Sequence, residues 1–137
     1  MKKFYCYARC STCKKAEKWL LENQVQFDKQ DLVADPPTKE ELLAIFAKSD
    51  RPLRYFFNTS GQDYRKLNLK EKVPTMTKEE AATMMSENGK LIKRPLMVDE
   101  KTVTCGFKPE VYQETWLWSN NRNSSMVSVE LRLFFSL

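Results

Sequence analysis

The first twenty residues change from a strand pattern to a helix pattern. In KKFYCY, Phe4 and Cys6 fall on one side and Tyr5 and Tyr7 on the other, an alternation that is typical of a strand. From Ser11 onward the apolar or uncharged positions follow helical spacing instead, and the lysines lie mostly on other faces. These positions are Ala16, Trp19, Leu20 and Asn23. The pattern predicts a strand that leads directly into an amphipathic helix.

A second strand and a block of helices are predicted next. VQFDKQDL, residues 25–32, favours a short strand, and the two prolines of ADPP then favour a turn. Thr38 with Glu41 forms a capping-box pattern, which predicts a helix of about ten residues. Residues 51–69 predict short helical pieces that are broken at NTSG, where Asn, Ser and Gly favour turns.

A second capping box opens the last helix of this block. Thr77 with Glu80 precedes KEEAATMMSE, which predicts a helix over residues 78–87. Asn88-Gly89 should end it, because both residue types tolerate a left-handed backbone.

The remaining pattern predicts a hairpin and a final helix. PLMVDEKTVTCGF favours two strands about Asp99 and Glu100, closed by Gly106, and Pro109 suits the first turn of a helix over residues 109–118. Two strands joined through a helix form a parallel unit, and the hairpin adds an antiparallel edge. We therefore expect a three-layer α/β domain with a small mixed sheet.

The hydrophobic pattern also predicts where this domain ends. The chain of 137 residues has room for one domain, which we place at residues 1–117. Residues 118–137 form an atypical tail: an Asn/Ser-rich start precedes alternating apolar residues without turn or cap signals. Three interpretations stay open for the tail, namely an added strand, an interface segment or a read-through artefact.

Composition narrows the classes of function. The net charge of +5 comes from 23 basic and 18 acidic residues that are interleaved, which favours a solvated mixed-charge surface over a nucleic-acid interface. No run approaches the roughly 18 apolar residues that a membrane span needs, and no signal peptide is evident. We expect a cytoplasmic protein with no direct nucleic-acid or membrane partner. In that compartment thiols stay reduced, so the four cysteines are not expected to form structural disulfides.

The spacing of Cys10 and Cys13 is the main chemical signal. The pair suits a redox site, half of a metal site, or two small apolar residues at a helix start. Placing Cys10 just before a helix directs unpaired backbone N–H groups and the positive end of the helix dipole at its sulfur, which favours the thiolate. Cys13, one turn later, is within disulfide range of a regular turn and would be the resolving thiol.

Other residues have plainer interpretations. A zinc site would need Cys6 and Cys105 as well, but these are not spaced as a second CxxC pair and the chain has no histidine. We expect Cys6 and Cys105 to pack as small apolar side chains on strands. Helical spacing places four further residues in the core: Trp19, Phe46, Met84 and Met85.

Three segments together carry a family resemblance: YARCSTCKKAEKWL, LRYFFNTSGQDYRKL and NGKLIKRPLMVDEKTVTCGFKPEVY. Residues 2–117 resemble the arsenate reductase (ArsC)-like family, which includes the Spx-type transcription regulators. The resemblance implies a thioredoxin-like fold, with a small mixed sheet flanked by helices and an inserted helical block. It also implies that Pro95 is a cis-proline facing the active cysteine.

The resemblance transfers the reductase site only in part. In the family's arsenate reductases the nucleophile matches Cys10, and three arginines hold the oxyanion. This sequence keeps Arg94, whereas the other two positions are Asn58 and Lys108. Arg94 is expected to bind an anion or thiolate, with a surface arginine paired to an acid as the alternative, and both interpretations stay open for Asn58 and Lys108.

Two functions are compatible with this resemblance. The leading hypothesis is a thiol-dependent oxidoreductase that acts on a thiol or disulfide and poorly on arsenate. It would need no metal or cofactor and would receive electrons from glutathione, glutaredoxin or thioredoxin. The alternative is a Spx-type regulator, in which the pair matching Cys10 and Cys13 is a redox switch and the domain binds RNA polymerase. The FNTSGQDYRKL segment looks closer to the reductases than to the regulators.

Overall fold

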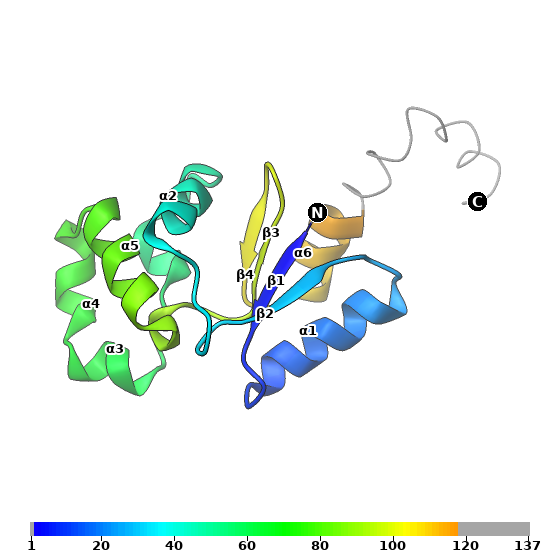
Figure 1. Ribbon diagram of the computed structural model, residues 1–137, viewed down its shortest axis with the longest axis horizontal. Coiled ribbons are helices and arrows are strands. Elements are labelled where there is room, and N and C mark those ends of the chain that lie inside the picture. The colour runs from blue at the N-terminus through cyan, green and yellow to red at the C-terminus, as the bar shows by residue number, and fades with distance from the viewer. Residues whose placement is uncertain (1, 118–137) are drawn as a thin grey trace.

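A single mixed sheet lies between two groups of helices in the computed structural model, which describes residues 2–117 (Figure 1). The strand order is β2-β1-β3-β4, with bounds Asp28–Asp31, Lys3–Cys6, Leu96–Val98 and Val103–Cys105. β1 is parallel to β2, whereas β3 is antiparallel to both β1 and β4. The predicted parallel unit and antiparallel hairpin are confirmed.

The central strand β1 contributes to a core on each face of the sheet. Phe4 and Cys6 pack against α1 (Ser11–Glu22) and the C-terminal helix, while Tyr5 packs against the helical block. All three side chains are buried, because helices cover both faces. This confirms the predicted alternation and the three-layer arrangement that Figure 1 shows.

The helical block has the expected breaks. Its helices are α2 (Lys39–Ala47), η1 (Leu53–Phe56), α3 (Gln62–Lys66), α4 (Leu69–Lys72), η2 (Val73–Thr75), α5 (Lys78–Glu87) and η3 (Gly89–Leu91). Both predicted capping boxes form, with the Thr38 and Thr77 hydroxyls accepting from the backbone N–H groups of Glu41 and Glu80.

The C-terminal helix also begins as predicted. α6 (Pro109–Tyr112) has proline in its first turn and continues as the π-helix η4 (Gln113–Leu117). Of the four predicted core residues, two are buried and two are partly buried: Phe46 and Met85, then Trp19 and Met84. Trp118 and the tail over residues 118–137 lie outside the described residues, so the domain boundary at 117 stays a prediction. No helix within residues 2–117 is long and apolar enough to cross a membrane.

Two segment boundaries differ from the prediction. Asn23 does not extend the helix but caps α1, where its backbone N–H donates to Leu21 and Trp19 carbonyls. The chain then turns through Gln24 at φ 58°, and β2 begins only at Asp28, opposite Lys3 of β1. The strand is shorter than its apolar pattern because pairing with β1 sets its length.

Gly89 follows the end of α5, but glycine is needed there for a different reason than predicted. Neither Asn88 nor Gly89 adopts a left-handed backbone, and Asn88 is extended at φ −147°. A Cβ at position 89 would instead lie 1.9 Å from the carbonyl oxygen of Leu32, in the loop after β2. Glycine is required here by the close approach of two backbones, a tertiary contact that a local pattern does not reveal.

Gly89→Ala should therefore destabilise the fold by about 1–3 kcal/mol, the usual range for overpacking. Backbone atoms of Leu32 and Val33 block the added methyl group and have little freedom to move. Gly61→Ala is the control, because its nearest atom is the movable Asn58 amide nitrogen. Urea unfolding followed by circular dichroism would measure both variants. Equal stabilities would show that the backbone contact at Gly89 is not tight.

Candidate functional site

Cys10 lies at the junction of β1 and α1, where a tight turn presents its sulfur. The backbone N–H of Cys10 donates to the carbonyl of Tyr7 at 2.9 Å, which closes the turn. Cys10 is the N-cap of α1, and its sulfur accepts from the backbone N–H of Cys13 at 3.4 Å. The side chain is partly exposed. A sulfur in this position replaces the usual capping oxygen and receives a free N–H of the first turn.

Cys13 occupies the opposite kind of environment. Its side chain is 3% exposed on the buried face of α1, and its sulfur accepts from the backbone N–H of Tyr7 at 3.4 Å. Burial raises the pKa of the Cys13 thiol to about 12, because it disfavours the charged form. Both cysteines are free thiols. The pair therefore consists of one accessible sulfur and one buried, protonated sulfur.

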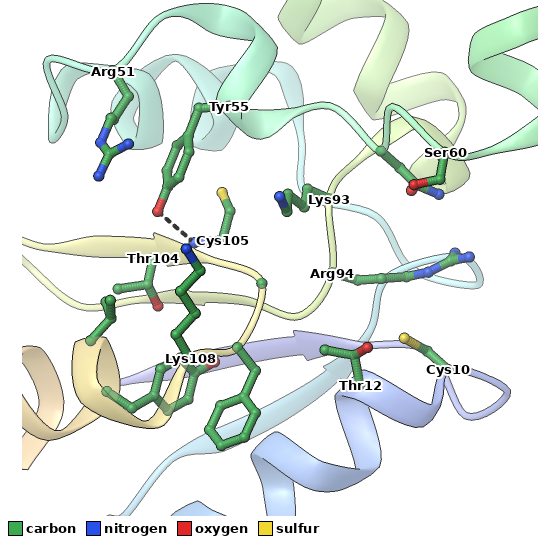
Figure 2. Close-up of a pocket in the computed structure, with 15 residues that line it drawn as sticks. Cys10, Thr12, Arg51, Tyr55, Ser60, Lys93, Arg94, Thr104, Cys105 and Lys108 are labelled. Atoms are coloured by element: carbon green, nitrogen blue, oxygen red, sulfur yellow. Dashed lines mark hydrogen bonds between the residues drawn. The ribbon is translucent and has the colours of Figure 1, made fainter.

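A pocket of about 650 Å³ opens beside Cys10 (Figure 2). The structure brings four of the five residues of the predicted site together in its lining, namely Cys10, Asn58, Arg94 and Lys108, whereas Cys13 does not line it. They come from the start of α1, the segment after η1, the segment just before β3 and the cap of α6. Their roles remain predictions, but their convergence on one cavity is what a shared site requires.

Arg94 lies at the Cys10 end of this pocket. The Arg94–Pro95 bond is cis, as the resemblance implied. The guanidinium carbon lies 4.9 Å from the centre of the Tyr7 ring, and Nη1 is buried without a hydrogen-bond partner among the described residues. Neither of the ion pairs found in residues 2–117 includes Arg94, so no acidic residue in this part of the chain pairs with it. A buried, unsatisfied guanidinium N–H favours an anionic ligand.

Asn58 and Lys108 offer weaker anion contacts than arginines would. The Asn58 amide nitrogen donates to the carbonyl of Lys90 at 3.4 Å, so part of its donor capacity is already used. Lys108 is an exposed side chain at the cap of α6. One is neutral and the other is a point charge without the planar fork of an arginine.

Several pocket residues were not predicted from the sequence. Arg51 stacks over the ring of Tyr55, with 4.7 Å between the guanidinium carbon and the ring centre. The Tyr55 hydroxyl accepts from the backbone N–H of Cys105 at 3.2 Å (Figure 2). Lys93 also lines the cavity. Lys93 could have been predicted from its position next to Arg94. The Tyr55–Cys105 contact joins residues 50 positions apart, and no local pattern predicts it.

The two remaining cysteines behave differently from each other. Cys6 is buried in the core, as predicted. Cys105 was expected to pack in the same way, but it is only partly buried and lines the pocket. Burial nevertheless raises the pKa of the Cys105 thiol, although Lys93 and Arg51 act in the opposite direction. Cys105 packs against the hydrophobic core from a strand, as predicted, and it also borders the cavity because β4 is an edge strand.

An aromatic hydroxyl also lines the pocket. Tyr112 is buried, and its hydroxyl makes no hydrogen bond of good geometry within residues 2–117, although the Thr104 hydroxyl is near enough to lower its pKa against the effect of burial. The neighbouring Thr104 hydroxyl accepts from the indole nitrogen of Trp116 at 3.0 Å. Burial raises the pKa of Tyr112, so the phenol stays protonated and is a potential donor.

The structure gives the zinc alternative no support. Within residues 2–117, no group of three or more His, Cys, Asp or Glu side chains is placed to hold a metal ion. Cys6 and Cys105 belong to separate hydrophobic clusters on the two faces of the sheet.

Comparison with known proteins assigns most of the chain to one family. The profile of the ArsC family matches residues 5–115. The uncharacterized protein YusI of Bacillus subtilis is 47% identical over 113 residues, 82% of this chain and 96% of YusI. The regulatory protein MgsR of the same organism is 33% identical over 106 residues, covering 77% and 82%. The global transcriptional regulator Spx 2 of Bacillus anthracis is 28% identical over 106 residues, covering 77% and 79%.

Solved structures agree with this assignment. An ArsC family related protein from Bacteroides fragilis is 49% identical with a TM-score of 0.78, covering 82% of this chain and 95% of its own. A possible arsenate reductase from Streptococcus mutans is 38% identical with a TM-score of 0.75, covering 79% and 92%. The expected thioredoxin-like fold, a mixed sheet flanked by helices, is confirmed.

Proposed function

Because the chain belongs to the ArsC family, we propose that it is a thiol-dependent oxidoreductase that reduces a disulfide through Cys10 and Cys13. One observation carries the proposal: the two sulfurs are three residues apart, one at a helix cap beside a cationic pocket and the other buried behind it. This is the asymmetry that an attacking thiol and a resolving thiol require.

The reaction would proceed by two exchanges. The Cys10 thiolate attacks one sulfur of the substrate disulfide, a Cys10–substrate disulfide forms, and the other half leaves as a thiolate that takes up a proton. Cys13 then loses its proton and attacks the Cys10 sulfur, which releases the second half and leaves a Cys10–Cys13 disulfide. Two electrons pass from the protein to the substrate. Glutathione, glutaredoxin or thioredoxin would return the protein to its dithiol form.

Neighbouring groups would favour the first exchange. The Cys13 N–H donates to the Cys10 sulfur and orients it at the start of the helix. Arg94 at the same end of the pocket adds a permanent positive charge. Both groups belong to the protein, and the proposed exchange needs no cofactor.

Trapping of the mixed disulfide tests this proposal. Cys13→Ser should accumulate a stable Cys10 adduct with glutathione disulfide, because the resolving thiol is gone. Cys10→Ser should form no adduct at this site, and Cys6→Ser is the matched control that should behave like wild type. Intact-mass and peptide mass spectrometry would locate the adduct. An adduct that is resolved as fast in Cys13→Ser as in wild type would contradict the role of Cys13.

The resolution step should depend strongly on pH. The pKa of Cys13 is raised to about 12, so its thiolate fraction rises about tenfold per pH unit between pH 6 and 8. Stopped-flow measurement of the second thiol released should show this slope in wild type. A rate that is constant over this range would mean that Cys13 is already ionised or does not act.

A redox-sensing regulator is the second candidate. It is favoured by the likeness to the regulatory protein MgsR and to Spx 2, together with the CxxC pair. A pull-down of purified RNA polymerase with the reduced and the oxidised protein would separate the two functions. Binding that changes with the state of Cys10 and Cys13 would favour the regulator.

A further inference from the structure

We propose that the disulfide substrate carries a carboxylate, which binds between Arg51, Lys93 and Lys108 at the end of the pocket away from Cys10. This inference rests on the proposed function of Cys10 as the attacking thiol. It adds a substrate class, a small anionic disulfide, and a recognition subsite that is separate from the reacting sulfur.

The charge of the pocket is the first observation. Four lining side chains are cationic, namely Arg51, Lys93, Arg94 and Lys108, and no Asp or Glu of residues 2–117 lines the cavity. None of the four takes part in an ion pair within residues 2–117. Elsewhere the chain mixes acidic and basic residues closely. A cavity with one sign of charge attracts ligands of the opposite sign.

The placement of two of these cations is the second observation. Arg51 lies over the Tyr55 ring, whose hydroxyl is fixed by the Cys105 N–H. Lys93 passes over Gly106, where a Cβ would lie 3.2 Å from the Lys93 Cε. Gly106 has a left-handed backbone at φ +79°, which favours glycine. Its lack of a Cβ also leaves room for the Lys93 side chain to lie over it. Both cations therefore lie near Cys105.

An unpartnered donor is the third observation. Tyr112 lines the same cavity, and its buried hydroxyl makes no hydrogen bond of good geometry within the described part of the chain, with only the Thr104 hydroxyl close to it. A buried hydroxyl without a partner is unfavourable unless a ligand or water completes it. A carboxylate oxygen accepts from a phenol and attracts the lysine and arginine charges at the same time.

The distance along the pocket explains why the ligand needs both a disulfide, to reach Cys10, and a carboxylate, to reach the cations. Figure 2 shows Cys10 and Arg94 at one end and Arg51 and Tyr55 at the other, with Lys93, Cys105 and Lys108 between. The cavity of about 650 Å³ is in the usual range for small ligands. A ligand whose disulfide reaches Cys10 would extend its carboxylate to the cationic end. The exchange itself is unchanged: a Cys10–sulfur bond forms, and the substrate sulfur–sulfur bond breaks to release a thiolate.

The rate of Cys10 adduct formation with disulfides of different charge tests the subsite. The probes are 3,3′-dithiodipropionate, which is anionic, 2-hydroxyethyl disulfide, which is neutral, and cystamine, which is cationic. In the full-length Cys13→Ser protein, where the adduct persists, the anionic probe should react at least about tenfold faster than the neutral one at low salt. Cystamine should be the slowest.

Charge-removing variants locate the effect. Arg51→Gln with Lys93→Gln should reduce the ratio of anionic to neutral rates to near one. Lys70→Gln with Lys72→Gln removes the same charge from exposed positions on α4 and should keep the ratio. Equal rates for all probes, or equal loss of selectivity in both double variants, would overturn the subsite alone. Failure of Cys10 to react with any disulfide would overturn the proposed function and the subsite with it.

Discussion

At pH 7, Cys13 should be alkylated at least about 100-fold more slowly than a free cysteine, whereas Cys10 should react readily. The Cys13 side chain is 3% exposed and burial raises its pKa to about 12, so almost none of it is thiolate at pH 7. A free thiol with a pKa near 8.5 has a thiolate fraction of about 3%. Cys10 is partly exposed at the helix cap and receives an N–H donor at its sulfur.

The measurement compares iodoacetamide rates at each cysteine in Cys10→Ser and Cys13→Ser, resolved by peptide mass spectrometry. Cys6 provides an internal reference for a buried thiol, because burial also raises its pKa. If the protein that retains only Cys13 of the pair reacts faster at pH 6, the roles of the two thiols are reversed.

Arsenate turnover should be very low in the wild-type protein. Catalysis on a tetrahedral oxyanion depends on donors that are already placed around the developing charge, and each lost donor commonly costs about 10²–10³ in rate. Asn58 is neutral and its amide donates to the Lys90 carbonyl, while Lys108 lacks a planar fork of donors. Arg94 alone should bind the anion weakly.

Arsenate reduction with glutathione and glutaredoxin tests this expectation. Asn58→Arg with Lys108→Arg should raise turnover by at least about 100-fold over wild type, because two charged donors are restored. The same double variant with Cys10→Ser is the control and should be inactive. Robust wild-type turnover that is lost in Cys10→Ser would contradict the donor argument.

The sequence predicted the parts of the fold that depend on local signals. The capping boxes at Thr38 and Thr77, the proline at the start of α6 and the alternation in β1 each involve neighbours within four residues. Features that depend on distant partners were not predicted. The length of β2 follows from its register with β1, and Gly89 is set by its contact with Leu32.

The candidate site divides in the same way. Cys10 and Cys13 were predicted from their spacing, and Arg94, Asn58 and Lys108 from a family resemblance. Of the cationic end of the pocket only Lys108 was predicted, because Arg51 and Tyr55 reach Cys105 from a segment about fifty residues earlier. Surface cations are common in a chain with 23 basic residues, so their sequence positions alone carry no signal.

The most direct test of the central claim is the mass of wild-type protein after reaction with excess 3,3′-dithiodipropionate, followed by peptide mapping. The account predicts a protein two hydrogens lighter, a disulfide between Cys10 and Cys13, and two thiols released per chain. A protein of unchanged mass, or a disulfide or adduct confined to Cys6 or Cys105, would contradict it.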